Sequence, residues 1–84
     1  MAKVLYFARF RDAIGIGEEL VDLVPSDNTL GALCIRLRER GGGYAVAFKD
    51  LEKVRGAIDL AMAPLDAPLG FPGEIAFFPP VTGG

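Results

Sequence analysis

The sequence is poor in the side chains that usually perform catalysis or bind metals. It has no histidine, which is the commonest acid–base group and metal ligand in proteins. Its only serine, Ser26, sits among turn-forming residues without a base partner, and its only cysteine, Cys34, falls on the apolar stripe of a predicted helix. We therefore predict no metal site, no bound cofactor and no complete set of catalytic groups within this chain.

Features that commonly reveal a partner or a compartment are also missing. The formal charge is −2 without a basic block, which argues against nucleic-acid binding. No stretch approaches the ~20 apolar residues of a membrane-spanning helix. Lys3, Arg9 and Arg11 interrupt the N-terminal apolar run, so this run does not resemble a signal peptide. A lone cysteine permits no internal disulfide. We expect a cytoplasmic protein that binds neither nucleic acid nor a membrane.

Composition and hydrophobic patterning indicate one small α+β domain over residues 1–84. Apolar residues make up 51% of the chain and charged residues 24%, as in globular proteins. Runs rich in β-branched and aromatic residues predict strands over 3–10, 18–24, 54–62 and 74–78, with a short edge-like strand over 66–69. Short helical turns are expected over 11–14 and 44–48.

One main helix follows the second predicted strand. Thr29 is a favourable N-cap, and apolar residues then recur at helical spacing as Leu30, Leu33, Cys34 and Leu37. The glycines at 41–43 are expected to stop this helix and not to bind phosphate, because no Gly-Lys-Ser/Thr follows them. The element order predicts a mixed sheet packed on one helix. Periodicity does not give strand order, but a last strand lying centrally beside the first would make this the β-grasp, ubiquitin-like plan.

Residues 79–84 are expected to form a flexible tail. Pro79 and Pro80 lack N–H groups, so they end strand pairing and stiffen the exit from the last strand. The arm beyond them consists of Val81, Thr82, Gly83 and Gly84. An arm ending in two glycines could enter a channel that larger side chains would block, and it would deliver the Gly84 carboxylate. A carboxylate becomes electrophilic when another enzyme converts it to an acyl-adenylate with ATP. The sequence therefore predicts a carrier or a modifier.

Three segments carry a family resemblance. They are Lys3-Val-Leu-Tyr-Phe-Ala-Arg-Phe-Arg11, Thr29-Leu-Gly-Ala-Leu33 and Glu74-Ile-Ala-Phe-Phe-Pro-Pro-Val-Thr-Gly-Gly84. Together they resemble the small subunit of molybdopterin synthase, the sulfur carrier of molybdenum cofactor synthesis, and the resemblance covers essentially the whole chain. A terminal Gly-Gly alone is shared by ubiquitin and other β-grasp carriers. The Phe-Phe-Pro-Pro stretch is more specific, and the thiamine sulfur carrier lacks it.

The resemblance implies a sulfur-transfer cycle centred on Gly84. An E1-like adenylyltransferase would activate this carboxylate with MgATP, and a persulfide donor would supply the sulfur of a thiocarboxylate. The tail would then enter the large subunit of the synthase and give sulfur to cyclic pyranopterin monophosphate, which forms the molybdopterin dithiolene. The resemblance also implies a heterotetramer of two small and two large subunits. This chain would be the sulfur donor of a sulfurtransferase whose catalytic groups lie in the large subunit.

Residues that contact the partner are expected in the tail and on the neighbouring sheet. Alternation places Phe77 and Phe78 on opposite faces, so one of them cannot share the helix-covered core. An apolar patch beside the tail would suit a partner interface. Together with the family resemblance, this predicts the following partner-binding residues: Gly83, Thr82, Val81, Pro80, Phe78, Phe7, Met62 and Arg11. Arg11 is expected to pair with an acidic residue of the partner.

Two departures from the family pattern and several alternative functions stay open at this point. Phe71-Pro72-Gly73 replaces an acidic turn that often precedes the last strand, and Asp59 stands where asparagine is common. A ubiquitin-like protein modifier joined to lysines through Gly84 is the main alternative. A sulfur carrier for thiamine synthesis or tRNA thiolation is another, and a β-grasp binding module with an idle tail is a third.

Overall fold

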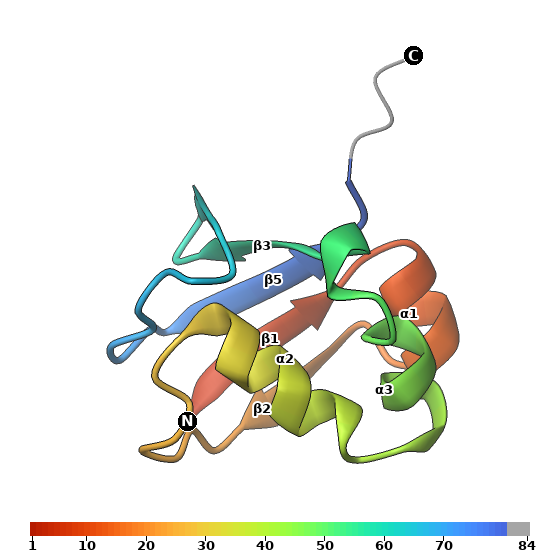
Figure 1. Cartoon of the computed structure of the whole chain (residues 1–84), viewed down its shortest axis with the longest axis horizontal. Helices are drawn as coiled ribbons and strands as arrows, with labels where there is room; N and C mark the ends of the chain where they lie inside the picture. The colour runs from red at the N-terminus through yellow and green to blue at the C-terminus, as the bar shows by residue number, and fades with distance from the viewer. Residues whose placement is uncertain (81–84) are drawn as a thin grey trace.

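A mixed five-stranded sheet forms one layer of the protein, and its longest helix crosses one face of that sheet (Figure 1). The computed structural model describes residues 1–80. Its elements are β1 (Ala2–Tyr6), α1 (Arg9–Ile14), β2 (Glu18–Val21), α2 (Leu30–Arg38), α3 (Gly42–Ala47), the short 3-10 helix η1 (Leu51–Lys53), β3 (Arg55–Ile58), β4 (Ala61–Ala63) and β5 (Glu74–Phe78).

The last strand lies at the centre of the sheet. The strand order is β2-β1-β5-β3-β4, and β5 runs parallel to β1 and antiparallel to β3. Figure 1 shows the β1 and β5 arrows side by side and pointing the same way. The predicted α+β fold with a β-grasp plan is therefore confirmed, and β5 brings the chain out at the end of the sheet where β1 also ends.

Two predicted strands are shorter than the sequence patterns suggested. The strand over 3–10 is wrong beyond Tyr6, because the chain turns through Ala8 and Phe10 enters α1. There the Phe10 ring is fully buried, 5.4 Å from the ring centre of Phe48. The strand over 18–24 ends at Val21, since the Val24 N–H donates to the Asp27 carboxylate instead of to a neighbouring strand. Local alternation did not reveal either of these tertiary contacts.

The predicted strand over 54–62 is in fact a hairpin. Asp59 and Leu60 have φ values of 47° and 73°, and they turn the chain between β3 and β4. Positive φ at both turn positions is typical of Asn-Gly, so a leucine there gave no turn signal. The short strand expected over 66–69 is also wrong, because that segment makes only an isolated bridge between Pro68 and Thr29.

The glycines at 41–43 have a different role from the predicted one. The main helix ends at Arg38, before the glycines, and Gly42 begins α3. A Cβ on Gly43 would lie 2.0 Å from the carbonyl oxygen of Ala13, so only glycine permits α3 to approach α1 this closely. Gly43 is thus a packing residue between two short helices.

The main helix packs as its apolar stripe predicts. Leu30, Leu33, Cys34 and Leu37 are all fully buried, and the Thr29 side chain accepts a hydrogen bond from the N–H of Ala32 at 3.1 Å. Burial raises the pKa of the Cys34 thiol to about 12, which makes it a core residue and a poor nucleophile. Alternate positions of the central strands complete the core: Val4, Tyr6, Ile75 and Phe77.

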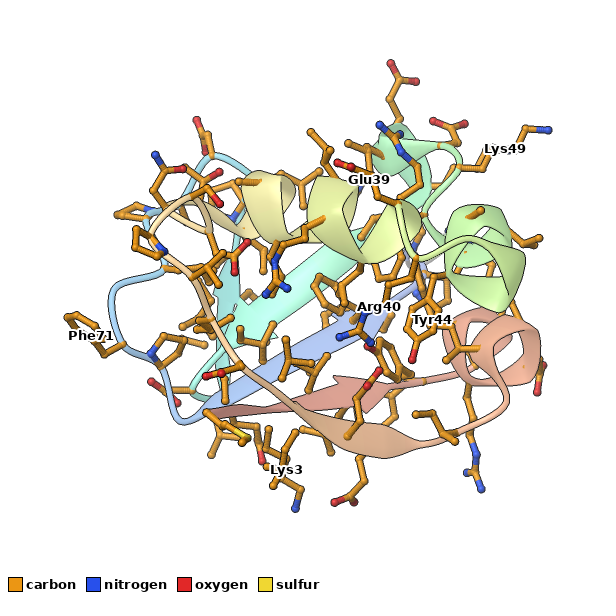
Figure 2. All side chains as sticks on the ribbon, turned by 90° about the horizontal axis from the view of Figure 1, so that it is seen from below. Lys3, Glu39, Arg40, Tyr44, Lys49 and Phe71 are labelled. Carbon is orange, nitrogen blue, oxygen red and sulfur yellow. The ribbon has the colours of Figure 1, made fainter. Side chains whose placement is uncertain are left out.

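A polar cluster on the helix side ties β1 and β2 to α3. The Glu19 carboxylate accepts hydrogen bonds from Tyr6 (2.8 Å), Tyr44 (2.6 Å) and Arg40 (3.0 Å). Figure 2 shows Arg40 beside the Tyr44 ring, and its guanidinium carbon lies 4.9 Å from the ring centre. Partial burial alone would raise the pKa of Glu19, but these hydrogen bonds outweigh it and lower the pKa. The ionised carboxylate therefore stabilises the fold.

We predict that Glu19→Gln lowers stability at neutral pH and has a smaller effect in acid. The folded-state pKa lies below the ordinary value of 4.5, so the ionised group's contribution is present above that pH and is lost as the pH falls through the folded pKa. Urea titrations should show a loss of about 1–3 kcal/mol at pH 7 and a shrinking difference toward pH ~3.

The matched control is Glu18→Gln, one residue away. Glu18 pairs with Lys3 at 3.2 Å on the surface, where both side chains are about half exposed, so its replacement should cost less than about 0.5 kcal/mol at either pH. Equal losses for the two variants would contradict a special role for Glu19.

Candidate functional site

The face of the sheet away from α2 is the candidate docking surface. Because side chains alternate along a strand, the core residues of each strand have neighbours that point to this other face. In the pairing register, Leu5, Ala76, Ala57 and Met62 form one row across β1, β5, β3 and β4. We call this side the open face, and its residues are Lys3, Leu5, Glu18, Leu20, Arg55, Ala57, Met62, Glu74, Ala76 and Phe78.

The open face carries exposed apolar side chains. Met62 is 69% exposed and Leu20 is 66% exposed, while Leu5, Ala57 and Ala76 are half-buried. In Figure 2 the helices lie on one side of the sheet and Lys3 points away from them. An apolar surface of this kind, beside the exit of the tail, is what a protein interface needs.

Phe77 and Phe78 point to opposite faces, as alternation predicted. Phe77 is fully buried and meets Phe48 with ring centres 5.0 Å apart, so it belongs to the core. Phe78 is half-buried and lies opposite Arg55 on the open face. Of the two phenylalanines, only Phe78 is therefore placed to contact a partner.

A strained turn fixes Phe7 beside the end of β5. The Phe7 N–H donates to the carbonyl oxygen of Phe77 at 3.0 Å, and the Phe10 N–H donates back to Phe7 at 3.1 Å. Between them Ala8 has φ 52° and ψ −126°, a conformation that normally favours glycine. Phe7 is 48% exposed, so the turn holds an aromatic side chain at the surface near Phe78.

The remaining predicted contact residues lie at different distances from this end. Met62 is on the edge strand β4, two strands from β5, and Arg11 is exposed on α1. Pro79 and Pro80 continue directly from β5 and are half-buried. The structure thus brings Phe7, Phe78 and Pro80 together at one end of the sheet, with Met62 at its edge and Arg11 on the helix beside it. The last predicted site residues, Val81, Thr82, Gly83 and Gly84, lie outside the described residues.

Sequence reasoning missed one residue near the site, Arg55, and the structural role of Asp59 at the opposite end of β5. Arg55 lies next to Phe78 in the sheet, and alternation along β3 could have placed it on the open face with Ala57. Asp59 holds the start of β5: its carboxylate accepts hydrogen bonds from the N–H groups of Gly73 (3.0 Å) and Glu74 (2.9 Å). The unusual turn before β5 is therefore anchored by the residue that also departs from the family pattern.

The described part of the chain gives no indication of a resident metal. Within residues 1–80, no three His, Cys, Asp or Glu side chains gather closely enough to hold an ion. Among the helices of that same part, none is both long enough and apolar enough to cross a bilayer.

Comparison with known proteins identifies the family. The ThiS family model matches residues 4–84, which is nearly the full length. This chain belongs to the ThiS family. Within the family it is 34% identical to the molybdopterin synthase sulfur carrier subunit of Escherichia coli K12, and 37% identical to that of Haemophilus influenzae. Both alignments cover 100% of each chain, so the resemblance to the synthase small subunit is confirmed over its whole length.

Solved structures of similar proteins share the fold of this ThiS-family chain. A protein from Pyrococcus furiosus, described as a candidate subunit 1 of a molybdopterin converting factor, matches with a TM-score of 0.72 and 28% identity. The match covers 95% of this chain and 97% of the other. The crystal structure of SAMP1 from Haloferax volcanii has a TM-score of 0.69 at 24% identity, covering 99% and 98%, and supports the fold alone.

Proposed function

We propose that this chain is the sulfur carrier subunit of a molybdopterin synthase and acts in the cytoplasm. The observation that carries the proposal is the full-length similarity to two such subunits, at 34% and 37% identity. The structure supports it, because β5 lies at the centre of the sheet and leads directly into Pro79-Pro80 and the tail.

The proposed reaction uses the Gly84 carboxylate as the sulfur-carrying group. A carboxylate oxygen attacks the α-phosphorus of MgATP on an E1-like adenylyltransferase, and diphosphate leaves. The terminal sulfur of a persulfide donor then displaces AMP from the acyl-adenylate and forms an acyl disulfide. A thiol attacks the donor's sulfur in this disulfide, so that a second disulfide leaves and the thiocarboxylate remains on Gly84. In the large subunit, this sulfur passes to cyclic pyranopterin monophosphate, and Gly84 returns as a carboxylate. Because a dithiolene contains two sulfur atoms, two charged carriers are consumed for each pterin.

The division of labour follows from the residues available. The chain has no histidine, and its only cysteine is buried in the core, so the commonest acid–base group and the thiol nucleophile are not available for pterin chemistry. We infer that the catalytic groups reside in the large subunit. This chain then acts as a reagent that docks, delivers one sulfur and leaves to be charged again.

Docking is assigned to the open face and the exit of the tail. Phe78 and Phe7 lie where β5 leads into Pro79 and Pro80, Met62 is on the open face, and Arg11 is exposed on α1. Burying these apolar side chains against a partner would position the tail at the entrance of a channel. The central strand is rigidly paired on both sides, so the direction of the tail's first residues is fixed by the sheet.

We predict that removing Gly84, or adding one residue after it, abolishes sulfur transfer and leaves the fold intact. Both changes alter the reactive carboxylate's position, while the free energy of unfolding should change by less than about 0.5 kcal/mol. Gly83→Val should also block adenylation or sulfur transfer, because a branched side chain would obstruct a narrow channel. Gly83→Ala serves as the graded control. Normal transfer by the Gly84 deletion would refute the proposed role.

We predict that Phe78→Ala weakens binding to the large subunit by roughly 1–3 kcal/mol in a calorimetric titration. Its thermal stability should fall only modestly, because Phe78 is half-buried on the open face. The control is Phe77→Ala, which should cost about 3–5 kcal/mol of stability since the ring fills the core. Unchanged affinity for Phe78→Ala would show that the open face is not the docking surface.

A further inference from the structure

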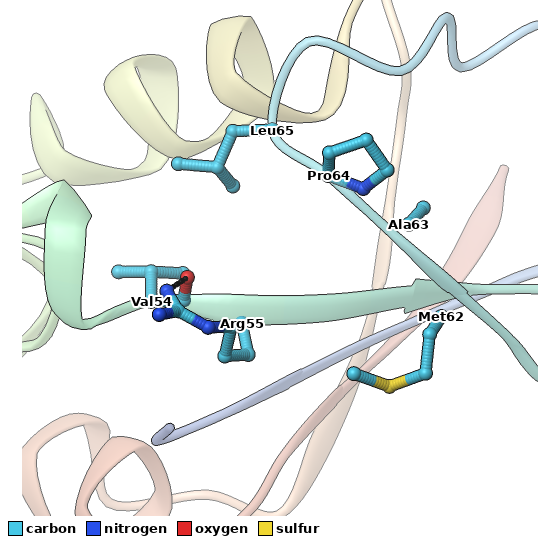
Figure 3. Close-up of a pocket in the computed structure, with 6 residues that line it drawn as sticks. All are labelled: Val54, Arg55, Met62, Ala63, Pro64 and Leu65. Carbon is cyan, nitrogen blue, oxygen red and sulfur yellow. Dashed lines mark hydrogen bonds between the residues drawn. The ribbon is translucent and has the colours of Figure 1, made fainter. Parts of the chain in front are cut away.

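A groove lies where the edge strand β4 separates from β3. Its volume is about 410 Å³, and its lining residues are Val54, Arg55, Met62, Ala63, Pro64 and Leu65 (Figure 3). Figure 3 shows Leu65 on one side of the β3 ribbon and the Met62 side chain on the other. The groove therefore wraps around the edge of the sheet and is continuous with the open face at Met62 and Arg55.

The separation of the two strands has a simple cause. Pairing between β3 and β4 ends at Gly56 and Ala63, so the next pair would join Arg55 to Pro64. Proline has no N–H to donate, and the chain departs there toward α2. Beyond the proline, the carbonyl oxygen of Leu65 accepts a hydrogen bond from the N–H of Gly31 at 2.7 Å. The groove is thus built into the fold, with one wall fixed to the helix and the other to the sheet.

The groove combines apolar walls with a cation. Arg55 is exposed, and its Nη1 donates to the carbonyl oxygens of Glu52 (2.9 Å) and Val54 (3.0 Å), which hold the guanidinium at one end of the groove. Within residues 1–80 the ion pairs are Lys3–Glu18, Arg36–Asp27 and Arg40–Glu19, and none of them includes Arg55. Its charge is therefore available to an anion from outside this part of the chain.

We propose that this groove binds a segment of the synthase large subunit that presents an apolar side chain next to a carboxylate. The apolar side chain contacts Met62 on the open face, and the carboxylate pairs with Arg55. The assignment rests on the proposed function. Two features favour this occupant: the exposed guanidinium of Arg55 is complementary to a carboxylate, and the groove continues the open face to which we assign docking of the large subunit.

The position of Arg55 gives the contact a specific task. Arg55 lies opposite Phe78, the last residue of β5, while Met62 lies on the far edge strand. An apolar contact at Phe78 alone would leave the carrier free to rotate about the direction of its tail. Contacts at both Arg55 and Met62 prevent this rotation. The groove is thus a specificity site that orients the carrier, and it supplements the apolar docking contact.

The test compares full-length variants in titrations against the purified large subunit. Arg55→Glu reverses the charge, and Arg55→Leu removes it while keeping an apolar stem. Lys49→Glu is the matched control: it makes the same charge change at an exposed site on the helix side, as Figure 2 shows. Phe78→Ala reports independently on docking through the open face. Each protein is measured at about 50 mM and about 500 mM salt, and thermal melts verify folding.

We expect Arg55→Glu to weaken binding about tenfold or more at low salt, Arg55→Leu by a smaller factor, and Lys49→Glu by less than about twofold. The difference between wild type and Arg55→Leu should shrink at high salt, because screening weakens the ion pair.

Three results would overturn the assignment. If both Arg55 variants bind like wild type while Phe78→Ala binds weakly, the groove is not used and the proposed function stands. Equal losses for Arg55→Glu and Lys49→Glu would indicate only long-range attraction between charges. If the wild-type chain does not bind the large subunit at all, the proposed function itself fails, and the groove proposal fails with it.

Discussion

The central position of β5 is the constraint on which the rest of the structure depends. This strand pairs with β1 on one side and β3 on the other, so its backbone cannot rotate or slide without breaking two ladders. Pairing then forces Phe77 into the core and Phe78 onto the open face. The same pairing sends Pro79 and Pro80 out at the end of the sheet where Phe7 is held. Core, docking surface and tail exit are therefore set by one strand.

The two faces of the sheet have separate tasks. On the helix side, partly or fully buried polar groups hold elements together, as Glu19 does for β1, β2 and α3 and as Asp27 does with Arg36. On the open face, apolar side chains remain exposed and Arg55 carries a charge with no carboxylate partner among the described residues. A carrier that must dock, release and dock again needs this arrangement, because its stability does not depend on the surface that its partners contact.

Residue patterns could predict the architecture where local periodicity and burial agree. The stripe from Leu30 to Leu37, the Thr29 cap and the strand 74–78 are examples, and alternation correctly separated Phe77 from Phe78. Predictions from residue patterns were wrong where contacts between residues far apart in the sequence determine the local structure. Phe10 follows a strand-like run but is drawn into a helix by the aromatic core, and Leu60 occupies a turn position that usually requires asparagine or glycine. The groove beside Arg55 forms where Pro64 ends the pairing of β4 with β3. The proline predicts the end of a strand, but local patterns do not show which neighbouring strand is left there.

The most direct test of the account is the intact mass of the protein after incubation with its activating enzyme, MgATP and a persulfide donor. The account predicts a mass increase equal to replacement of one oxygen atom by sulfur in the wild-type chain, and no change in a variant lacking Gly84. Fragmentation should place the sulfur at Gly84. An unchanged wild-type mass would contradict the account. The same increase in the variant lacking Gly84 would also contradict it, because the exchange of oxygen for sulfur would then not require Gly84.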